Sequence, residues 1–246
     1  WLNNRWLRGG FPRALLADTM QLSREWRDAF IRTYLERDLP QLGINLPALT
    51  LRRFWTMLAH YHGQTWNGSE LARSLGVSDK TVSRYLDILE GTFMAYRLMP
   101  WHANVGKREI KSPKVYVTDS GLLHSLLGIG DEDALLAHPK CGASWEGFIL
   151  REIIHRMNVK RGEAYFWGVH SGGELDLLIV QDGRRLGFEI KLTKSPQMTV
   201  SMRSATEILK LDHLYVICHS EGEPWPMSEG VTAMPASCLA SEQWLS

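Results

Sequence analysis

The sequence predicts a mixed α/β protein, with a helical N-terminal piece, a winged helix-turn-helix and an α/β C-terminal domain. Before Glu163, apolar residues recur mainly at the three- and four-residue spacing of amphipathic helices. After it, strand-like runs such as AYFW and HLYVICHS alternate with one helical stretch, SPQMTVSMRSATEILKL. We therefore expect three segments: a helical junction at residues 1–45, a winged helix-turn-helix domain at 46–140 and an α/β domain at 141–246.

Composition limits the classes of function. The chain has 246 residues and a net charge of +1, so a nucleic-acid surface has to be a local basic patch. Its three cysteines form no CxxC pair, which suits a reducing cytosol and supplies no zinc motif. Neither an apolar run long enough to cross a membrane nor a signal peptide is visible, so we expect a cytoplasmic protein. No GxxxxGK[ST] motif occurs, so these residues are not expected to hydrolyse ATP.

Two helices are expected near the N-terminus. After an irregular stretch broken at residues 9–12 (GGFP), Ser23 is predicted to be the N-cap of the first. That helix ends at Pro40, which cannot continue it. The second helix is expected at about 46–61.

Residues 69–91, SELARSLGVSDKTVSRYLDILEG, have the pattern of a helix-turn-helix. Ser69 is expected to cap the short first helix, and Gly76 to end it. The second helix, at about 79–90, would enter the major groove if this element binds duplex DNA. The charged residues of that helix are Asp79, Lys80, Arg84, Asp87 and Glu90.

Two extended runs within residues 93–121 predict a β-hairpin that forms the wing. Five cations in it face Glu109 alone, and such a stripe can contact phosphates. Winged helices also serve as protein-binding modules, and charge alone does not separate the two roles. The wing cations are Arg97, Lys107, Arg108, Lys111 and Lys114, and the predicted nucleic-acid-binding set is Lys80, Arg84, Lys107, Arg108, Lys111 and Lys114.

The segment GELDLLIVQDGRRLGFEIK, residues 173–191, predicts two strands around a tight turn. Its DG dipeptide at 182–183 is the strongest short signal for a two-residue type I′ hairpin. Such a loop fixes the register, so that the numbers of paired residues sum to 365. Four charged side chains would then share one face, with Asp176 opposite Glu189 and Glu174 opposite Lys191.

Two interpretations of this charged face stay open. Directly opposed carboxylates have Cβ atoms about 4.5–5.5 Å apart and repel each other. The repulsion falls when a divalent cation such as Mg²⁺ or Mn²⁺ binds both carboxylates. The alternative is a solvated face with a Glu174–Lys191 ion pair across the strands, which contributes little to stability.

Asp176 followed by Glu189-x-Lys191 resembles the D…ExK signature of the PD-(D/E)xK nuclease-like superfamily. Glu146, in the preceding predicted helix SWEGFILRE, matches the additional acidic residue that many members supply. The resemblance implies a catalytic set of Glu146, Asp176, Glu189 and Lys191, in which the three carboxylates hold Mg²⁺ or Mn²⁺ against a phosphodiester. In such sites the ion activates a water, and the lysine orients it or neutralises developing charge.

The segment before this hairpin departs from the pattern of the prokaryotic proteins that the chain resembles most broadly. Those proteins often have an arginine and a threonine before the GxExDL stretch, whereas this chain has Trp167 and Gly168. If that arginine binds phosphate, its absence counts against catalysis. His170 is a possible substitute, although a single loop histidine is more often only solvated.

A wider resemblance covers nearly the whole chain. It is carried by RGGFP, YLERDLP, LARSLGVSDKTVSRYLDILEGTF, NVGKREIKSPKVYVTDSGLLHSLLG, HPKCGASWEGF and GGELDLLI…FEIK. Their order and spacing are similar to the C-terminal region, a domain of unknown function, that follows the AAA-type P-loop ATPase module in a prokaryotic family. The resemblance implies such a module before Trp1 and ATP as a ligand of that module alone. Arg8 or Arg37 would face its nucleotide site or, as we prefer, be ordinary surface or junction arginines.

Two functional hypotheses follow. The first is a nucleic-acid-binding region, with DNA as the expected partner, that carries a metal-dependent nuclease site and works with the ATPase module in cis. The second is a catalytically silent module that binds DNA or a partner protein for the ATPase. The triad of Asp176, Glu189 and Lys191 favours the first, and the weak charge of the second helix of the helix-turn-helix favours the other.

Overall fold

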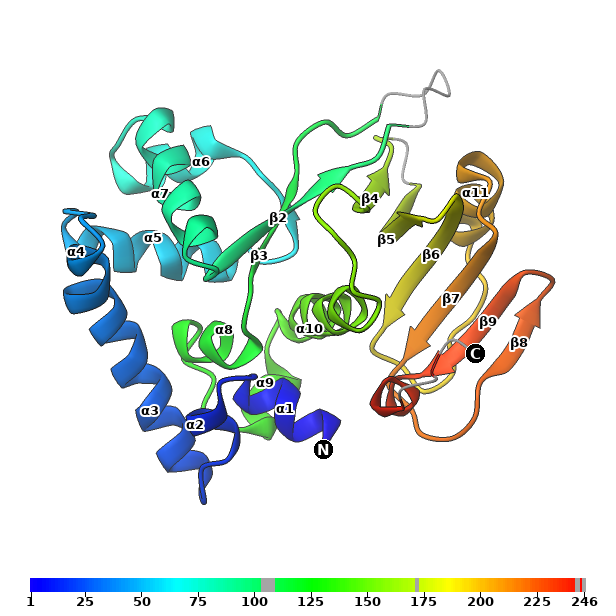
Figure 1. The fold of residues 1–246 in the computed structure, drawn as a ribbon, viewed down its shortest axis with the longest axis horizontal. Coiled ribbons are helices and arrows are strands. Elements are labelled where there is room, and N and C mark those ends of the chain that lie inside the picture. Colours follow the sequence, from blue (N-terminus) through cyan, green and yellow to red (C-terminus); the bar gives the residue numbers. More distant parts are fainter. Residues whose placement is uncertain (103–108, 171–172, 242–243, 245–246) are drawn as a thin grey trace. The chain divides into compact units, whose positions relative to one another are not determined.

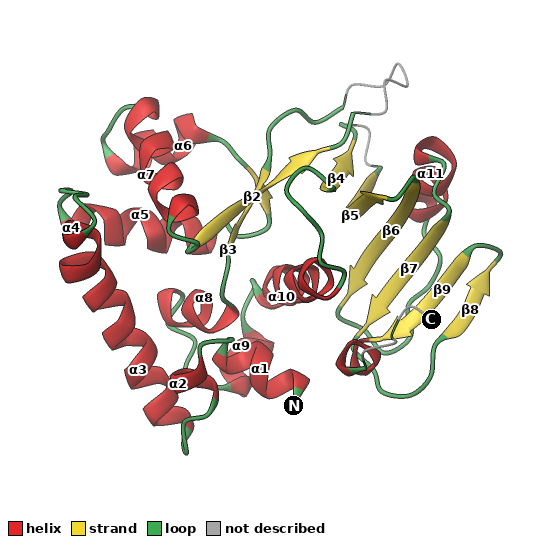
Figure 2. Ribbon diagram, viewed as in Figure 1, coloured by secondary structure: helices red, strands yellow, loops and turns green. Residues whose placement is uncertain are grey.

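The structure, a computed structural model, describes residues 1–102, 109–170, 173–241 and 244. The chain divides into two compact units. The first consists of residues 1, 3–97 and 115–147, and the second of residues 2, 98–114 and 148–246. Helices dominate the first unit and strands the second (Figure 2), which confirms the mixed α/β class.

The first unit is a set of helices around one apolar core (Figure 1). Phe54 and Trp55, on one helix, and Leu86, on another, are completely buried in this core. The elements up to the boundary are α1 (Leu2–Arg8), α2 (Pro12–Leu15), α3 (Met20–Thr33), a π-helical turn (Tyr34–Asp38), α4 (Leu39–Gln41), α5 (Ala48–His60), β1 (Gln64–Thr65), α6 (Gly68–Leu75), α7 (Asp79–Gly91), β2 (Ala95–Pro100), β3 (Lys114–Val117), α8 (Ser120–Leu126), α9 (Glu132–Ala137) and α10 (Cys141–Arg156).

Two expected N-caps were wrong. The side chain of Thr19, four residues before Ser23, accepts the backbone N–H of Leu22 at 3.2 Å, so α3 begins one turn earlier and Ser23 is buried inside it. The side chain of Asn67 likewise caps α6, where Ser69 was expected to be the cap. In both helices the capping side chain accepts an otherwise unpaired N–H of the first turn.

Helices α6 and α7 form the expected pair around a short turn. Gly76 ends α6 with φ 70°, a left-handed conformation that favours glycine. Ser78 then caps α7, and its hydroxyl accepts the N–H of Thr81 at 3.2 Å. Leu71 and Val82 point from the two helices into the core of the first unit.

A buried polar network fastens α1 to the rest of the first unit. The indole of Trp6 donates to the Ser144 hydroxyl at 3.0 Å, and that hydroxyl lies 2.7 Å from Nε2 of His124. Nδ1 of His124 lies 3.0 Å from the carbonyl oxygen of Leu7. A neutral imidazole that donates through Nδ1 and accepts through Nε2 satisfies every group in this chain of contacts.

The segment after α1 is held by Asp119, the N-cap of α8. One carboxylate oxygen of Asp119 accepts from Leu122 N at 2.8 Å, and the other accepts from Gly10 N at 2.7 Å. Arg27 is completely buried nearby and donates to the carbonyl oxygen of Gly121 at 2.8 Å. Burial raises the pKa of Asp119, and these N–H donors and the Arg27 charge oppose that rise.

The second unit contains a twisted sheet with one helix on a face. Its strands follow the order β2-β4-β5-β6-β7-β9-β8, with β6, β7 and β9 parallel and the β5–β6 and β8–β9 pairs antiparallel. Met202 and Leu209 of the helix pack against Leu178 and Leu214 of the sheet. The elements are β4 (Ala164–Gly168), β5 (Glu174–Gln181), β6 (Arg184–Lys191), α11 (Val200–Leu209), β7 (His213–Cys218), β8 (Trp225–Ser228), β9 (Val231–Pro235) and a 3₁₀ turn (Ala236–Ala240).

The hairpin register is confirmed near the turn. Asp182 and Gly183 have φ angles of 52° and 76°, as a type I′ turn requires. The paired residues run from Gln181↔Arg184 to Leu177↔Phe188, and each pair sums to 365. Strand β5 does not alternate between buried and exposed side chains, because residues 175–179 are all buried.

Two strands at the end of the sheet were missed. Sequence analysis places no strand after HLYVICHS, whereas β8 and β9 follow it. Pro226 within WPMS argues against a strand, yet β8 is the edge strand, where a missing N–H is tolerated. None of the helices in the described part of the chain combines the length and apolar character that a bilayer crossing requires.

We expect the first unit to lose stability in acid. Burial lowers the pKa of His62 to about 3 and that of His124 to about 4, from 6.5. Above pH 6.5 both folded and unfolded states are neutral; below it, only the unfolded chain binds these protons. The free energy of unfolding should therefore fall as the pH falls from about 6.5 to about 4, by about 1.4 kcal/mol for each pKa unit of difference.

Urea unfolding, followed by tryptophan fluorescence across this pH range, measures the effect. His124→Gln should flatten the dependence, and His170→Gln, at an exposed position, should leave it unchanged. If the wild type, His124→Gln and His170→Gln show the same pH dependence, the buried His124 is not a cause of the loss of stability in acid.

A second prediction concerns the packing of α8 against the chain after α1. A Cβ atom at Gly121 would fall onto the carbonyl oxygen of Arg8, which is backbone and cannot swing aside. We expect Gly121→Ala to lower the free energy of unfolding by about 1–3 kcal/mol. Gly142→Ala, in α10 with open space around it, is the matched control and should be neutral or slightly stabilising. Equal unfolding midpoints would refute this packing argument.

Candidate functional site

A β-bulge shapes the end of the hairpin at Asp176. Tyr165 of β4 pairs with Leu178, but Trp167 pairs with Leu175, so Asp176 and Leu177 together face the single residue between the two on β4. Such a bulge twists a strand and re-aims a side chain. It also breaks the two-residue period from which the shared face of Glu174 and Asp176 was deduced.

The carboxylate of Asp176 takes part in the β5–β6 pairing. Beyond Leu177↔Phe188, its Oδ2 accepts the backbone N–H of Ile190 at 2.8 Å. Asp176 is 8% exposed and Glu189 is 5% exposed. The two carboxylates are therefore buried at the end of the hairpin, which differs from the solvated face of the alternative interpretation.

The two lysines near this site pair differently from the expected arrangement. Lys191 Nζ lies 2.6 Å from Oε1 of Glu189, its neighbour two residues away on the same strand. Glu174 pairs instead with Lys114, with 2.5 Å between Nζ and Oε1. The expected Glu174–Lys191 pair is replaced by these two contacts.

Lys114 is a buried lysine, and its expected role as an exposed wing cation was wrong. It is 6% exposed, and its ammonium lies over the ring of Phe166 at 5.5 Å from the centroid. Phe166 is also the β4 residue opposite the bulge. Glu174 is itself held by Ser201, whose hydroxyl contacts both backbone groups of Glu174.

Glu146 belongs to the first unit, whereas the hairpin carboxylates and Lys191 belong to the second. Its Oε1 accepts the hydroxyl of Tyr116 at 2.7 Å. No group of three or more Asp, Glu, His or Cys side chains that could hold a metal ion occurs among the described residues. The donor set that remains at the hairpin is the oxygen pair of Asp176 and Glu189.

Of the predicted nucleic-acid-binding residues, Lys80 and Arg84 on α7 and Lys111 are exposed. Lys107 and Arg108 lie outside the described residues. Arg97 was expected to face solvent as a wing cation, but it does so only in part. Its side chain is 21% exposed and pairs with Asp87 and Glu90 of α7.

The remaining candidates have structural surroundings. Arg8 donates to the carbonyl oxygens of Leu15 and Ala17, and Arg37 is exposed and contacts Asp38. Trp167, where the chain departs from the pattern of the prokaryotic proteins that it resembles, is completely buried in the core of the second unit. His170 is exposed.

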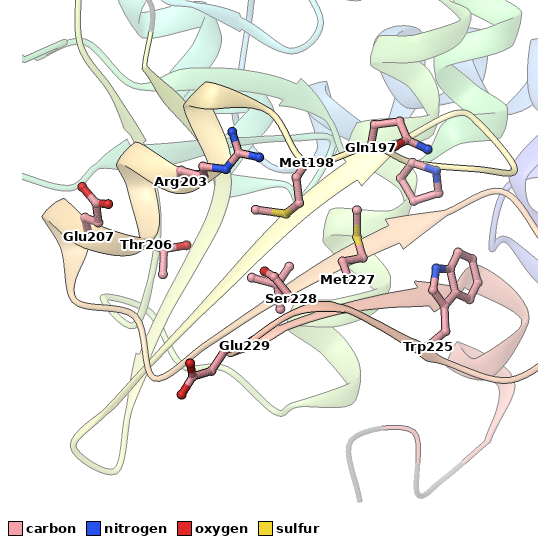
Figure 3. A pocket seen from close by; sticks show the side chains of 11 residues that line it. Gln197, Met198, Arg203, Thr206, Glu207, Trp225, Met227, Ser228 and Glu229 are labelled. Atoms are coloured by element: carbon pink, nitrogen blue, oxygen red, sulfur yellow. The ribbon is translucent and has the colours of Figure 1, made fainter.

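A hollow of about 590 Å³ lies elsewhere in the second unit, between α11 and β8 (Figure 3). Met198, Met227 and Trp225 supply its apolar surface, and Arg203 and Glu207 project from α11 beside it. None of the predicted site residues lines this hollow. It is therefore separate from the hairpin carboxylates.

The fold and the hairpin define a protein with a helical unit followed by an α/β unit. Residues 1–133 match the model of a family described as Domain of unknown function (DUF8612), and residues 141–239 match Domain of unknown function (DUF4143), which is known as an ATPase-associated C-terminal domain. The chain belongs to the DUF8612 family, whose model covers more than half of it.

Two mycobacterial proteins are similar to nearly the whole chain. They are the uncharacterized protein Mb2031c of Mycobacterium bovis and the uncharacterized protein Rv2008c of Mycobacterium tuberculosis, each 49% identical over 231 residues. The match covers 94% of this chain and 52% of each relative, so the chain spans about half of their length. No solved structure matches the chain.

We expect Lys114 to stabilise the second unit. Lys114→Ala removes a buried ion pair and the contact of the ammonium with the ring of Phe166, but Glu174 is half exposed and regains water. The free energy of unfolding should fall by about 1–2 kcal/mol. The exposed Lys111 gives the matched control Lys111→Ala, which should change it by less than about 0.5 kcal/mol. If Lys114→Ala and Lys111→Ala change the free energy of unfolding equally in chemical denaturation, Lys114 behaves as a surface cation and this prediction is wrong.

Proposed function

We propose that this chain is a nucleic-acid-binding region of an ATPase-associated protein, with a divalent-metal-dependent phosphodiesterase site at the end of the β5–β6 hairpin. The observation that carries the catalytic part is the burial of Asp176 and Glu189 beside the ammonium of Lys191. Burying two carboxylates in one place is costly unless hydrogen bonds and counter-charges compensate. Such arrangements concentrate at functional sites.

The donor set fits Mg²⁺ or Mn²⁺. Mg²⁺ takes oxygen ligands and is commonly held by one or two carboxylates, with waters and substrate phosphates completing its shell. Asp176 and Glu189 would be the protein ligands. When bound, the ion would supply a Lewis acid for the phosphoryl group and an activated water. Glu146 is not needed in this two-ligand site.

The residues of this chain have separate tasks in the proposed site. The bulge aims the Asp176 carboxylate, and its bond to Ile190 N fixes one of its oxygens. Lys191 counters the charge of Glu189, and its ammonium would also attract a substrate phosphate. The lysine is 39% exposed at its side chain, so a substrate in solvent can reach it.

Nucleic-acid binding is proposed for the first unit. In the winged helix-turn-helix interpretation, α7 is the helix that enters the major groove. Its exposed Lys80 and Arg84 lie one turn apart. Together these residues would contact phosphates and contribute a salt-dependent affinity.

A second candidate function is a silent module that binds nucleic acid or a partner protein. One specific observation favours it: Asp176, Glu189 and Glu146 each already contact a donor within the protein, namely Ile190 N, Lys191 and the Tyr116 hydroxyl. A carboxylate that is satisfied internally has less to gain from an ion.

Metal binding separates the two candidates without a guess about the substrate. We expect titration calorimetry to detect Mn²⁺ binding by the wild-type chain and at least a tenfold loss of affinity in Asp176→Asn. The amide oxygen of asparagine can still accept Ile190 N–H, so the hairpin should stay folded while the ligand charge is lost.

Glu146→Gln is the control, since the two-ligand site predicts unchanged Mn²⁺ affinity in this variant. If Glu146→Gln loses as much Mn²⁺ affinity as Asp176→Asn, Glu146 is a third ligand, as the three-carboxylate set requires. No binding by the wild type, together with a more stable Asp176→Asn protein, would overturn the phosphodiesterase proposal and leave the silent module.

A further inference from the structure

The exposed side of α7 carries three charged residues in one stripe. Lys80, Arg84 and Asp87 are spaced i, i+4 and i+7, and residues at this spacing lie on one face of a helix. Lys80 and Arg84 are exposed, and the side chain of Asp87 is 63% exposed. A surface suited to phosphates therefore contains a carboxylate one turn from its cations.

Arg97 of β2 contacts both acidic residues at the C-terminal end of α7. Its Nη2 lies 2.6 Å from Oδ1 of Asp87, and its Nη1 pairs with Oε2 of Glu90. The backbone N–H of Arg97 also donates to Oε1 of Glu90 at 3.4 Å. One guanidinium thus bridges two carboxylates that are three residues apart.

The geometry of this contact depends on arginine. A guanidinium presents several N–H groups in a fixed fork and binds two carboxylates at once, which an ammonium does less well. Because the Arg97 side chain is only 21% exposed, salt screens the contact less than it screens a pair in open solvent.

We infer that Arg97 is a positioning residue for the binding of duplex nucleic acid: its positive charge offsets half of the combined negative charge of Asp87 and Glu90, so that these carboxylates oppose less strongly the attraction of Lys80 and Arg84 for the phosphates. The inference rests on the nucleic-acid binding proposed above and is independent of the phosphodiesterase site. Without Arg97, α7 has three acidic residues against two basic ones. Its carboxylates would then repel the phosphates that the cations attract.

A purely structural role for Arg97 makes a different prediction. If Arg97 only fastens β2 to α7, removing its partners harms the protein as much as removing the arginine. If it masks negative charge, removing the carboxylates makes the arginine dispensable for binding. Substituting Arg97, Asp87 and Glu90 together therefore distinguishes a charge-masking role of Arg97 from a purely structural one.

The test is fluorescence anisotropy with a labelled DNA duplex in EDTA, which prevents metal-dependent cleavage, at several salt concentrations. We expect Arg97→Gln to weaken binding about fivefold or more at low salt. The triple variant Arg97→Gln/Asp87→Asn/Glu90→Gln should return to within about twofold of wild type. Asp87→Asn alone, which keeps the Arg97–Glu90 contact, should bind at least as tightly as wild type.

Two controls make the outcomes distinguishable. Arg161→Gln removes one exposed positive charge from the second unit and should change affinity less than Arg97→Gln does. Lys80→Gln/Arg84→Gln reports whether α7 is the binding helix at all, and it should reduce the magnitude of the salt slope by about 1–2.

Each remaining outcome counts against the inference in a defined way. Wild-type binding that depends on Lys80 and Arg84, with Arg97→Gln equal to Arg161→Gln, overturns the inference and keeps the proposed binding. The same holds if the triple variant binds as weakly as Arg97→Gln, or if Asp87→Asn binds more weakly than wild type. No duplex binding by the wild type overturns the proposed binding and the inference with it.

Discussion

The β-bulge at Asp176 is the constraint on which the candidate site depends. It places two residues of β5 opposite one residue of β4. The backbone pairing of β5 with β6 runs from the turn to Leu177, and beyond that pair the side chain of Asp176 contacts β6. A regular ladder would use the N–H of Ile190 for backbone pairing, whereas here the Asp176 carboxylate accepts it. The acid is thereby held in the sheet.

Much of the fold follows from local signals that the sequence states directly. The DG dipeptide at 182–183 requires positive φ at both positions, and the register near the turn follows from that requirement alone. Gly76 and Ser78 end one helix and begin the next for equally local reasons. At these positions one or two residues determine the backbone conformation, and prediction from the sequence succeeded, whereas at Ser23 and Ser69 another side chain nearby is the cap and prediction failed.

Prediction failed where a contact between distant residues decides the outcome. The bulge is imposed by pairing with β4, so the period of β5 alone cannot reveal it. The burial of Lys114 depends on Phe166 and Glu174, more than fifty residues away in the sequence. Counting cations along the wing gave Arg97 and Lys114 the same role, although each is paired within the protein.

These internal pairs change how the charge of the protein is to be counted. A net charge of +1 over the chain says little about a surface, because paired groups contribute almost nothing to the field that a partner meets. Lys114 and Glu174 cancel each other near the hairpin, and Arg97 offsets Asp87 and Glu90 on α7. With Arg97 included, the three basic groups Lys80, Arg84 and Arg97 balance the three acidic residues of α7, so a helix that is acidic by composition carries no net negative charge. Pairing, more than composition, thus determines whether α7 can approach a polyanion.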